Sequence, residues 1–342
     1  MTPEEIKLRR LSGQHLLQTA PTKTVVKDLC GIQAQFMGNA MHALKLRCSD
    51  YDETDFGSGL VKNWTLRGTV HVFSEADLPL FIRSDHYRSN DWSSPSFWNQ
   101  RDCWALTPQR QAYFSEVILA VLEEGPKTRE SLKTVCRAHG MTDAEAGSMF
   151  DPWGGGIREL CERGFLNYTA GEEKNFCLAP LFTPIPEEAA MLELARRYFT
   201  NFGPSTIHDA MYFFHTTAAQ VRKWLSALPV TAAEWGGITY FYIETGAPAG
   251  DIPGCLFLAG FDQLMLGCEK KESLFLPREH LRSIFNLAGI VHPAVLVDGI
   301  AVGRWSLKNG KLKVFLFSPA DKALIADTAA RLWPELKLLT FE

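Results

Sequence analysis

Two glutamines separated by one small apolar residue are the first residues of the chain whose types and spacing suggest chemistry. Gln33 and Gln35 flank Ala34 inside an otherwise helical pattern of apolar residues. A carboxamide carbonyl accepts hydrogen bonds and presents a negative dipole, but it is not a strong base. Such a pair can therefore orient a water molecule and stabilise developing positive charge.

A second polar set lies in a strand-like run farther along the chain. Arg67, Thr69 and His71 recur with a period of two, and Val70 and Val72 alternate with them. Residues with this period share one face of a strand. The three polar side chains are candidate phosphate contacts, and a solvated strand face explains the pattern equally well. His71 alone is more typical of a packed or hydrogen-bonded histidine than of a catalytic base.

Together, residues 31–35 and 64–71 resemble the signature of the winged-helix DNA glycosylases of the AlkZ/YcaQ type. In that family a Gln–aliphatic–Gln or Gln–aliphatic–Asp triplet does the chemistry, and an Arg-Gly-Thr segment follows it. The resemblance implies that Gln33 and Gln35 are catalytic. It also implies a DNA partner, excision of bulky N7-alkylguanine adducts and action on interstrand crosslinks.

The chemistry of N-glycosidic bonds agrees with a glutamine pair. Bond cleavage passes through an oxocarbenium-like transition state. A neutral base is a poor leaving group and needs a general acid, whereas an N7-alkylated purine already carries positive charge. We therefore expect a monofunctional DNA glycosylase that acts on double-stranded DNA carrying alkylated purines. Side chains two residues apart on a helix diverge by roughly 200°, so the two glutamines need a helix end or an irregular turn, which Gly31 permits.

The order of predicted elements indicates a mainly α fold with β: three tandem winged helix-turn-helix units followed by a small β-rich domain. Three helices and a strand at residues 64–73 form the first unit. The run Gly-Pro-x-Thr recurs at 125–128 and 203–206 between a first and a second helix, which indicates duplicated units. The predicted boundaries are 1–106 for the first winged-helix unit with the triplet and a connector, 107–183 for the second, 184–246 for the third and 247–342 for the β-rich domain.

Several element ends are predicted by capping and turn residues. Thr2 and Pro3 begin a helix that should run to about Gln18. Asp298-Gly299 and Asn309-Gly310 are hairpin turn signals between apolar runs. Further helices are expected at 187–201, 216–228 and 321–332, with wing strands at 164–168, 176–178 and 238–243.

Two further segments, Phe202–Asp209 and Phe261–Gly267, also resemble the glycosylase family. Directly after the second segment the chain reads Cys268-Glu269-Lys270-Lys271, where relatives more often carry an aromatic residue and an Asp-Arg pair. The role of this loop is therefore open.

Composition fits a globular protein. The chain has 342 residues, of which 46% are hydrophobic and 22% charged. We expect a cytoplasmic location, because no signal peptide or membrane span is recognisable. The eight cysteines are scattered without a Cys-x-x-Cys pair, which favours reduced, mostly buried thiols. No metal or other cofactor is expected.

The net charge of −4 counts mildly against a nucleic-acid partner, but the charge is unevenly spread. Residues 1–50 carry seven basic and four acidic residues, and residues 303–313 carry four basic residues and no acid. A local basic surface can bind phosphates despite an acidic total. Ordinary solvated charge explains the counts equally well.

Two other function classes stay open at this point. One is a non-enzymatic winged-helix DNA-binding protein or regulator. Regulators of this class usually dimerise on palindromic half-sites, whereas three tandem units without a heptad or dimer helix favour a monomer. The other is a protein-interaction module, which the acidic total charge favours.

Overall fold

The computed structural model describes residues 1–52, 59–65, 67–93, 104–171, 173–248 and 250–342. Leu66, which directly precedes the Arg-Gly-Thr segment, Glu172 of the predicted second wing and residues 94–103 of the predicted connector lie outside the described residues. The chain divides into two compact units, the first made of Met1–Tyr51 with Ala195–Glu342 and the second of Asp52–Leu194.

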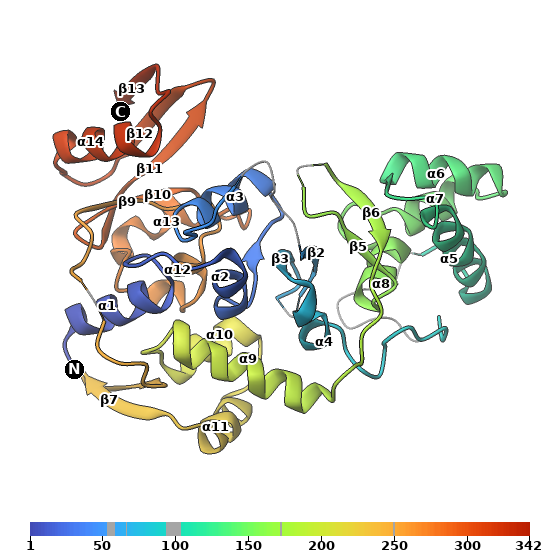
Figure 1. Cartoon of the computed structure of the whole chain (residues 1–342), viewed down its shortest axis with the longest axis horizontal. Coiled ribbons are helices and arrows are strands. Elements are labelled where there is room, and N and C mark those ends of the chain that lie inside the picture. The colour runs from blue at the N-terminus through green and yellow to red at the C-terminus, as the bar shows by residue number, and fades with distance from the viewer. Residues whose placement is uncertain (53–58, 66, 94–103, 172, 249) are drawn as a thin grey trace. The chain divides into compact units, whose positions relative to one another are not determined.

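The boundary at Tyr51 falls inside the range 1–106 that the sequence suggested as one unit. The finer four-part division stays a prediction. The fold itself is mixed, with helices and β-sheets in both units (Figure 1).

The first unit contains both ends of the chain. Its helices are α1 (Pro3–Gly13), α2 (Thr22–Asp28), α3 (Met37–Lys45), α10 (Ile207–Phe214), α11 (Ala218–Ala227), α12 (Gln263–Leu266), α13 (Leu281–Ile284) and α14 (Lys322–Leu332), with the 3-10 helices η2 (Lys270–Glu272) and η3 (Arg278–His280). Its strands are β1 (Ile32–Gln33), β7 (Thr231–Trp235), β8 (Ile238–Tyr242), β9 (Cys255–Phe257), β10 (Ala294–Val297), β11 (Ile300–Lys308), β12 (Lys311–Leu316) and β13 (Leu338–Phe341). Helix α9 (Glu187–Asn201) runs across the boundary between the units.

Helix α1 begins as predicted and ends early. The Thr2 hydroxyl accepts a hydrogen bond from the Glu5 amide, which caps the helix. The predicted end at Gln18 is wrong, because the helix stops at Gly13. A Cβ atom at Gly13 would lie 2.6 Å from the Asn201 carbonyl oxygen, so the close approach of α9 requires glycine at this point.

The C-terminal strands form one sheet in the order β13-β12-β11-β10-β9. Both predicted hairpin turns are confirmed: Asp298 and Gly299 have φ of 48° and 70°, and Asn309 and Gly310 have φ of 54° and 73°. Positive φ at both central residues is the requirement of a type I′ turn. Helix α14 covers this sheet, and its Ile325 is fully buried against it (Figure 1). Strand β13, which the sequence pattern did not predict, pairs in parallel with β12.

Helices α9, α10 and α11 precede the β7–β8 hairpin, so this stretch has the helix-helix-helix-hairpin order of a winged helix. Its interior is aromatic: the rings of Tyr198 and Phe202 stack at 5.3 Å, and Phe213 and Phe214 contact Tyr198. The predicted helix at 187–201 is confirmed, and the predicted helix at 216–228 is two residues shorter at its start.

The second unit carries its own sheet and helices. Its helices are α4 (Leu78–Phe81), α5 (Pro108–Leu122), α6 (Arg129–Ala138), α7 (Asp143–Met149) and α8 (Gly155–Glu162), with the 3-10 helix η1 (Glu75–Asp77). Its strands are β2 (Leu60–Trp64), β3 (Val70–Ser74), β4 (Lys127–Thr128), β5 (Leu166–Tyr168) and β6 (Asn175–Leu178), and they lie in the order β3-β2-β5-β6-β4. All these neighbours are antiparallel.

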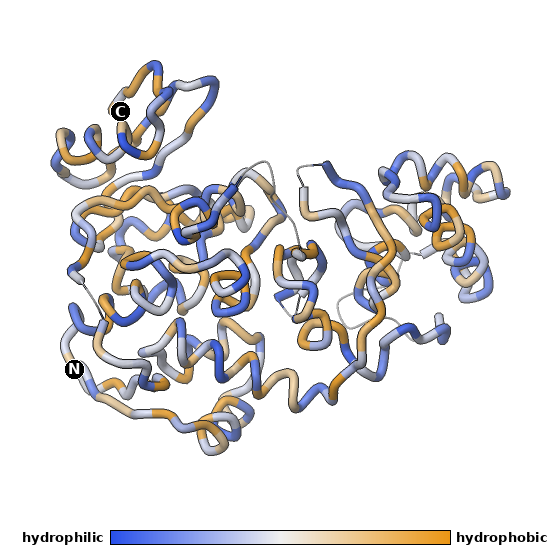
Figure 2. The backbone as a smooth tube through the Cα atoms, in the orientation of Figure 1, coloured by the Kyte–Doolittle hydropathy of each residue, from blue (hydrophilic) through white to orange (hydrophobic). Residues whose placement is uncertain are grey.

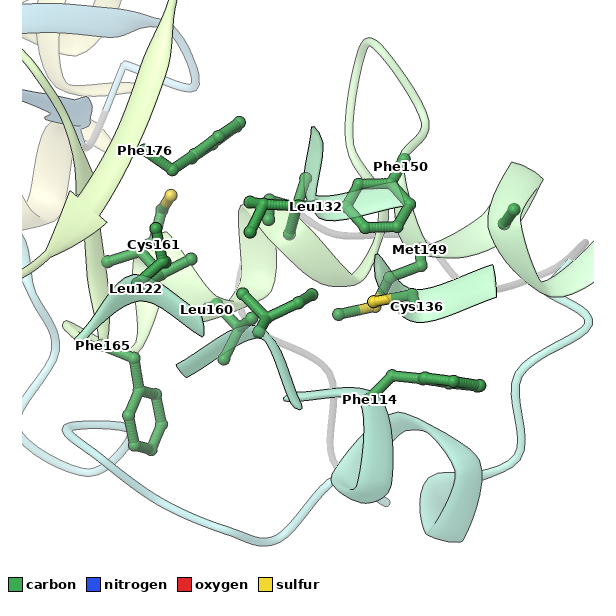
Figure 3. Close-up of a cluster of buried hydrophobic side chains, with 14 of the residues drawn as sticks. Phe114, Leu122, Leu132, Cys136, Met149, Phe150, Leu160, Cys161, Phe165 and Phe176 are labelled. Atoms are coloured by element: carbon green, nitrogen blue, oxygen red, sulfur yellow. The ribbon is translucent and has the colours of Figure 1, made fainter. Parts of the chain in front are cut away.

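Helices α5, α6 and α8 pack around one apolar core together with the β5–β6 hairpin, the predicted second wing (Figure 3). Thr107 and Thr128 cap α5 and α6 as capping residues predict. Helix α7 begins at a capping box that Thr142 and Glu145 form, a local signal that predicts a helix start here. The core residues that Figure 3 labels are Phe114, Leu122, Leu132, Cys136, Met149, Phe150, Leu160, Cys161, Phe165 and Phe176.

The winged-helix order of helices and hairpin thus recurs along the chain, and its reading as three tandem winged-helix units stays a prediction. Hydrophobic and hydrophilic residues alternate over short stretches of the backbone in both compact units (Figure 2).

Within the described ranges, no helix has the length and apolarity needed to cross a bilayer. Seven of the cysteines lie in the described ranges, and six of them are buried.

Candidate active site

The glutamine triplet lies where the chain leaves one helix and has not yet begun the next. Helix α2 ends at Asp28, and Cys30 and Gly31 follow with φ of 53° and 84°. The Gly31 amide donates a 2.7 Å hydrogen bond to the Val26 carbonyl, which closes the helix end. The two left-handed residues redirect the chain into strand β1.

Gln33 and Gln35 therefore avoid the divergence that a helix would impose. Gln33 is the second residue of the extended strand β1, and Gln35 lies in the bend that precedes α3. The expectation of an irregular turn after Gly31 is confirmed. Gln33 is 6% exposed, Ala34 is fully buried and Gln35 is partly exposed. The buried Ala34 side chain thus holds the bend against the core, and the two glutamines lie directly before and after it in the chain.

An aromatic pair lies next to the triplet, and the sequence pattern gave no indication of it. Phe36 directly follows Gln35, is 49% exposed and stacks on Phe261 with a centroid distance of 5.6 Å and an interplanar angle of 22°. Phe261 begins the Phe261–Gly267 segment that resembles the family. This family-like segment therefore reaches the residue adjacent to the triplet within the first unit.

His42, on helix α3, is half-buried beside aromatic residues of the C-terminal sheet and helix. Its Nε2 lies 2.7 Å from the Phe257 carbonyl oxygen, and its ring stacks on Trp333. Burial lowers the pKa of His42 below its ordinary value. The ring is therefore a neutral packing element at physiological pH.

Two buried ion pairs explain much of the family-like sequence in the first unit. Arg47 forms a bidentate pair with Asp262 of the Phe261–Gly267 segment, and both side chains are fully buried. Arg10 contacts Asp209 of the Phe202–Asp209 segment at 3.3 Å. A buried aspartate needs a cationic partner, so the two aspartates of the family-like segments predict that some basic residue pairs with each of them. Nothing local to the sequence identifies which arginines they are.

The loop that departs from the family pattern is anchored to the same network. The Glu269 amide donates a 2.8 Å hydrogen bond to Asp209 Oδ1. The Glu269 carboxylate in turn accepts from the Lys271 amide and caps the 3-10 helix η2. Cys268 is buried, and burial raises its pKa to about 12, so it is a neutral thiol.

Arg67, Thr69 and His71 belong to the second unit. The prediction of one strand over residues 64–73 is wrong, because strand β2 ends at Trp64, strand β3 begins at Val70, and Thr65, Arg67, Gly68 and Thr69 lie in the turn between them. Gly68, with φ of 69°, and the hydrogen bond from its amide to the Thr65 carbonyl make the reversal. Arg67 and Thr69 are therefore turn residues, and of the three only His71 lies in the strand.

His71 is a packed, hydrogen-bonded histidine, as the sequence favoured. It is 1% exposed, and its Nδ1 lies 2.9 Å from the Thr65 hydroxyl and 3.1 Å from the Thr69 carbonyl oxygen. Burial and the nearby Arg67 charge lower the pKa of His71 to about 3. The ring is neutral at physiological pH, so any contact with phosphate is a neutral hydrogen bond.

Lys62 on β2 is a buried amine that the sequence pattern did not single out. It is 3% exposed and lies 5.9 Å from the centroid of the Tyr168 ring. Burial and the nearby Lys174 charge lower the pKa of Lys62 to about 8. A fraction of this amine is therefore neutral near physiological pH.

The local basic surfaces are smaller than the charge counts indicate. Among the basic residues of 1–50, Arg10 and Arg47 form buried ion pairs, and Arg9 forms an ion pair with Glu244. In residues 303–313, Lys313 pairs with Glu342. Counting residues along a sequence cannot show these four pairs, because Glu244, Asp209, Asp262 and Glu342 are each distant in the chain from the basic residue that they contact.

No three His, Cys, Asp or Glu side chains gather as metal ligands in the part of the chain that the structure describes. Around the triplet, the first compact unit presents two carboxamides and the stacked rings of Phe36 and Phe261. It can orient water and contact an aromatic or cationic ligand.

Known proteins resemble this chain over most of its length. The family model for AlkZ-like DNA glycosylases matches residues 26–339. An interstrand DNA cross-link repair glycosylase of Streptomyces sahachiroi is 28% identical over 331 residues, which cover 89% of this chain and 87% of that protein. The solved structure of the Streptomyces sahachiroi DNA glycosylase AlkZ has the same fold, with a TM-score of 0.78, 23% identity and complete coverage of both chains. Because the family model matches most of its length, the chain belongs to the AlkZ-like family and is a DNA glycosylase.

Proposed function

We propose that this glycosylase hydrolyses the N-glycosidic bond of cationic N7-alkylpurine adducts in double-stranded DNA. In the proposed mechanism a water molecule is oriented between the carbonyl oxygens of Gln33 and Gln35. The observation that carries the proposal is the position of both glutamines outside helical geometry, on the extended strand and bend that follow Gly31.

The proposed chemistry needs positioning and a negative dipole more than it needs proton transfer. An N7-alkylated purine leaves with the electron pair of the N9–C1′ bond, and this neutralises its positive charge. The sugar becomes oxocarbenium-like, and carboxamide oxygens stabilise that developing charge. Water then adds to C1′ and loses a proton to solvent, while a glutamine carbonyl oxygen accepts a hydrogen bond from that water. A neutral base would require a general acid, and neither glutamine supplies one.

The related Streptomyces protein is named as an interstrand DNA cross-link repair glycosylase. We extend this activity to the present chain as part of the proposal: a crosslink joined through two N7-alkylpurines is cationic at each end, so the same site can release each one. Gln33 and Gln35 would act on one strand at a time.

DNA binding is proposed to use three tandem winged-helix units of a monomer acting in the cytoplasm. Arg67 and Thr69 lie in the hairpin turn between β2 and β3, in the compact unit Asp52–Leu194, where they can contact a backbone phosphate. His71 supports that turn through its contact with the Thr69 carbonyl oxygen. Arg67, Thr69 and His71 thus remain the proposed DNA-binding set.

The deciding experiment is incubation with duplex DNA carrying a single N7-methylguanine or a nitrogen-mustard crosslink, followed by alkaline cleavage at abasic sites. A matched duplex with uracil serves as the control for a neutral leaving group. We expect strand cleavage for both cationic substrates and none for uracil. An enzyme that releases uracil as fast as N7-methylguanine contradicts the proposed mechanism.

A further inference from the structure

Phe36 is an aromatic side chain on the surface of the first unit, immediately after the second glutamine of the triplet. Its ring is 49% exposed. Single exposed apolar side chains are common on proteins, and Leu287, which is 87% exposed, is another example in the same unit. The features that separate Phe36 from such residues are its fixed backbone and its aromatic partner.

The backbone of Phe36 is held in an extended conformation at the start of α3. Its φ and ψ are −117° and 105°, and its carbonyl accepts a 3.1 Å hydrogen bond from the Asn39 amide. The preceding Ala34 is fully buried and Met37 is buried as the first residue of α3. Phe36 thus projects from a short bend that is anchored on both sides.

The ring of Phe36 is supported from behind by Phe261, which is 8% exposed. Phe261 has a φ of 56°, and its amide donates a hydrogen bond to the Val291 carbonyl at 3.2 Å. The next residue is Asp262, which is locked by its bidentate pair with Arg47. A near-parallel ring stack of this kind leaves the outer face of Phe36 as a preorganised flat surface.

We propose that the outer face of Phe36 stacks on the alkylated purine and determines the preference for a cationic base. This inference rests on the proposed function of Gln33 and Gln35. An aromatic face carries negative potential and attracts a cation placed over it. A purine that carries positive charge on its ring is flat and cationic, so it meets both properties of the surface. Excision removes that charge, and the stack then weakens as the product base forms.

The first test measures single-turnover excision of N7-methylguanine from duplex DNA by wild-type enzyme and by Phe36→Leu, at enzyme concentrations below the Kd, so that the observed rate includes binding of the cationic base. We expect excision by Phe36→Leu to be slower by roughly 10- to 100-fold, as for the loss of one base–aromatic stack. Phe36→Tyr, which keeps the ring, should stay within about threefold of wild type, since the aromatic face is retained. Leu287→Ala is the matched control for loss of an exposed apolar side chain and should leave the rate unchanged.

A second test separates the charge of the base from its shape. It compares binding to duplexes that carry either a non-hydrolysable, cationic 2′-fluoroarabino N7-methylguanine or the neutral isostere 7-methyl-7-deazaguanine. Wild type should bind the cationic duplex more tightly, and pentafluorophenylalanine at position 36 should abolish that preference, because it keeps the ring shape and reverses its charge distribution. This variant also covers the case in which Phe36→Leu fails to fold.

The outcomes distinguish the two proposals. If wild type fails to release N7-methylguanine, the proposed function is wrong. If wild type is active and Phe36→Leu excises at the wild-type rate, the role of Phe36 is wrong while the proposed function stands. Equal loss of binding to damaged and undamaged duplexes would make Phe36 a general DNA contact and would also overturn the inference.

Discussion

Arg47 and Asp262 form two parallel hydrogen bonds in a place where neither side chain has exposed surface. The Nη1–Oδ2 distance is 3.1 Å and the Nη2–Oδ1 distance is 2.7 Å. Asp262 Oδ1 also accepts from the Leu264 amide and so caps α12. Arg47 follows α3, the helix that begins directly after the glutamine triplet. The pair therefore joins the C-terminal end of α3, the helix that follows the triplet, to the Phe261–Gly267 segment within the first unit.

The first prediction concerns the stability of this joint. Asp262→Asn leaves the Arg47 charge buried without a counterion, and loss of one partner of a buried pair costs about 3–5 kcal/mol. We expect the urea midpoint of unfolding to fall accordingly. Glu342→Gln, which breaks the exposed pair with Lys313, is the control and should change stability by less than about 1 kcal/mol. Equal effects of the two substitutions would show that the buried pair is not structural.

A second prediction follows from the lowered pKa of Lys62, which is about 8 against an ordinary value of 10.5. Below pH 8 the amine is protonated in both folded and unfolded chains. Between about pH 8 and 10.5 the folded chain releases the proton and the unfolded chain keeps it, so the unfolding free energy rises with pH. Wild type should therefore gain stability relative to Lys62→Met across this window.

The measurement is urea unfolding of wild type and Lys62→Met at several pH values from 7 to 10.5. The matched control is Lys308→Met, which removes an exposed lysine of strand β11. A difference between wild type and Lys62→Met that does not change with pH would show that Lys62 titrates as an ordinary lysine.

Local sequence signals predicted the element starts and turns, because the responsible interactions are local. Thr2 and Thr128 cap their helices through bonds to amides three residues away, and Asn309-Gly310 forms its turn without distant help. The end of α1 at Gly13 depends on packing against Asn201, so it escaped prediction. The strand predicted at 64–73 failed for a different reason: its period of two continued through a hairpin turn at Gly68.

The features of the candidate site also fall into those that the local sequence predicts and those that depend on distant contacts. Resemblance alone pointed to Gln33 and Gln35, and Gly31 correctly indicated an irregular backbone beside them. The partner of Arg47 is 215 residues away, and the partner of Phe36 is equally nonlocal. Burial of His71 and Lys62, which lowers both pKa values, also arises only in the packed unit. Distant contacts and desolvation are properties of the fold that no local pattern carries.

A third prediction tests Arg67 as a phosphate contact. Arg67→Ala should weaken DNA binding and reduce the slope of log affinity against log salt by roughly one unit, because one counterion fewer is released. Arg83→Ala is a matched control, since Arg83 pairs with Asp85 and Glu187 in the same unit. An unchanged salt slope for Arg67→Ala would remove Arg67 from the DNA-binding set.

The fourth prediction concerns the product, which should be an intact abasic site without a strand nick. Strand cleavage by β-elimination needs an amine that forms a Schiff base with the sugar aldehyde. The triplet offers no amine, and Lys62, a lysine of the second compact unit with a lowered pKa, is only 3% exposed. Borohydride treatment at pH 8 should therefore trap no covalent enzyme–DNA adduct. A trapped adduct that is lost in Lys62→Met would identify Lys62 as a nucleophile and refute the prediction.

The fifth prediction addresses the glutamines. Single-turnover excision of N7-methylguanine should vary little between about pH 6 and 8, because a carboxamide does not titrate. His71 adds no inflection in this range, since its pKa is about 3. Gln33→Ala or Gln35→Ala should slow excision by about 10²-fold, within the range of general-base and electrostatic contributions. DNA affinity should change little, because phosphate contacts supply most of it.

Gln35→Asp is the most informative substitution at the triplet, since it places a carboxylate where this chain has a carboxamide. A carboxylate accepts a proton better than a carboxamide and stabilises an oxocarbenium more strongly, so the variant should stay active. It should also gain an acidic limb: excision should fall as pH drops through the carboxyl pKa, ordinarily about 3.9. Wild type lacks a titrating group at this position and should show no such limb. If the Gln33→Ala/Gln35→Ala double variant excises at the full rate, the glutamines have no catalytic role and the water must be held by other groups.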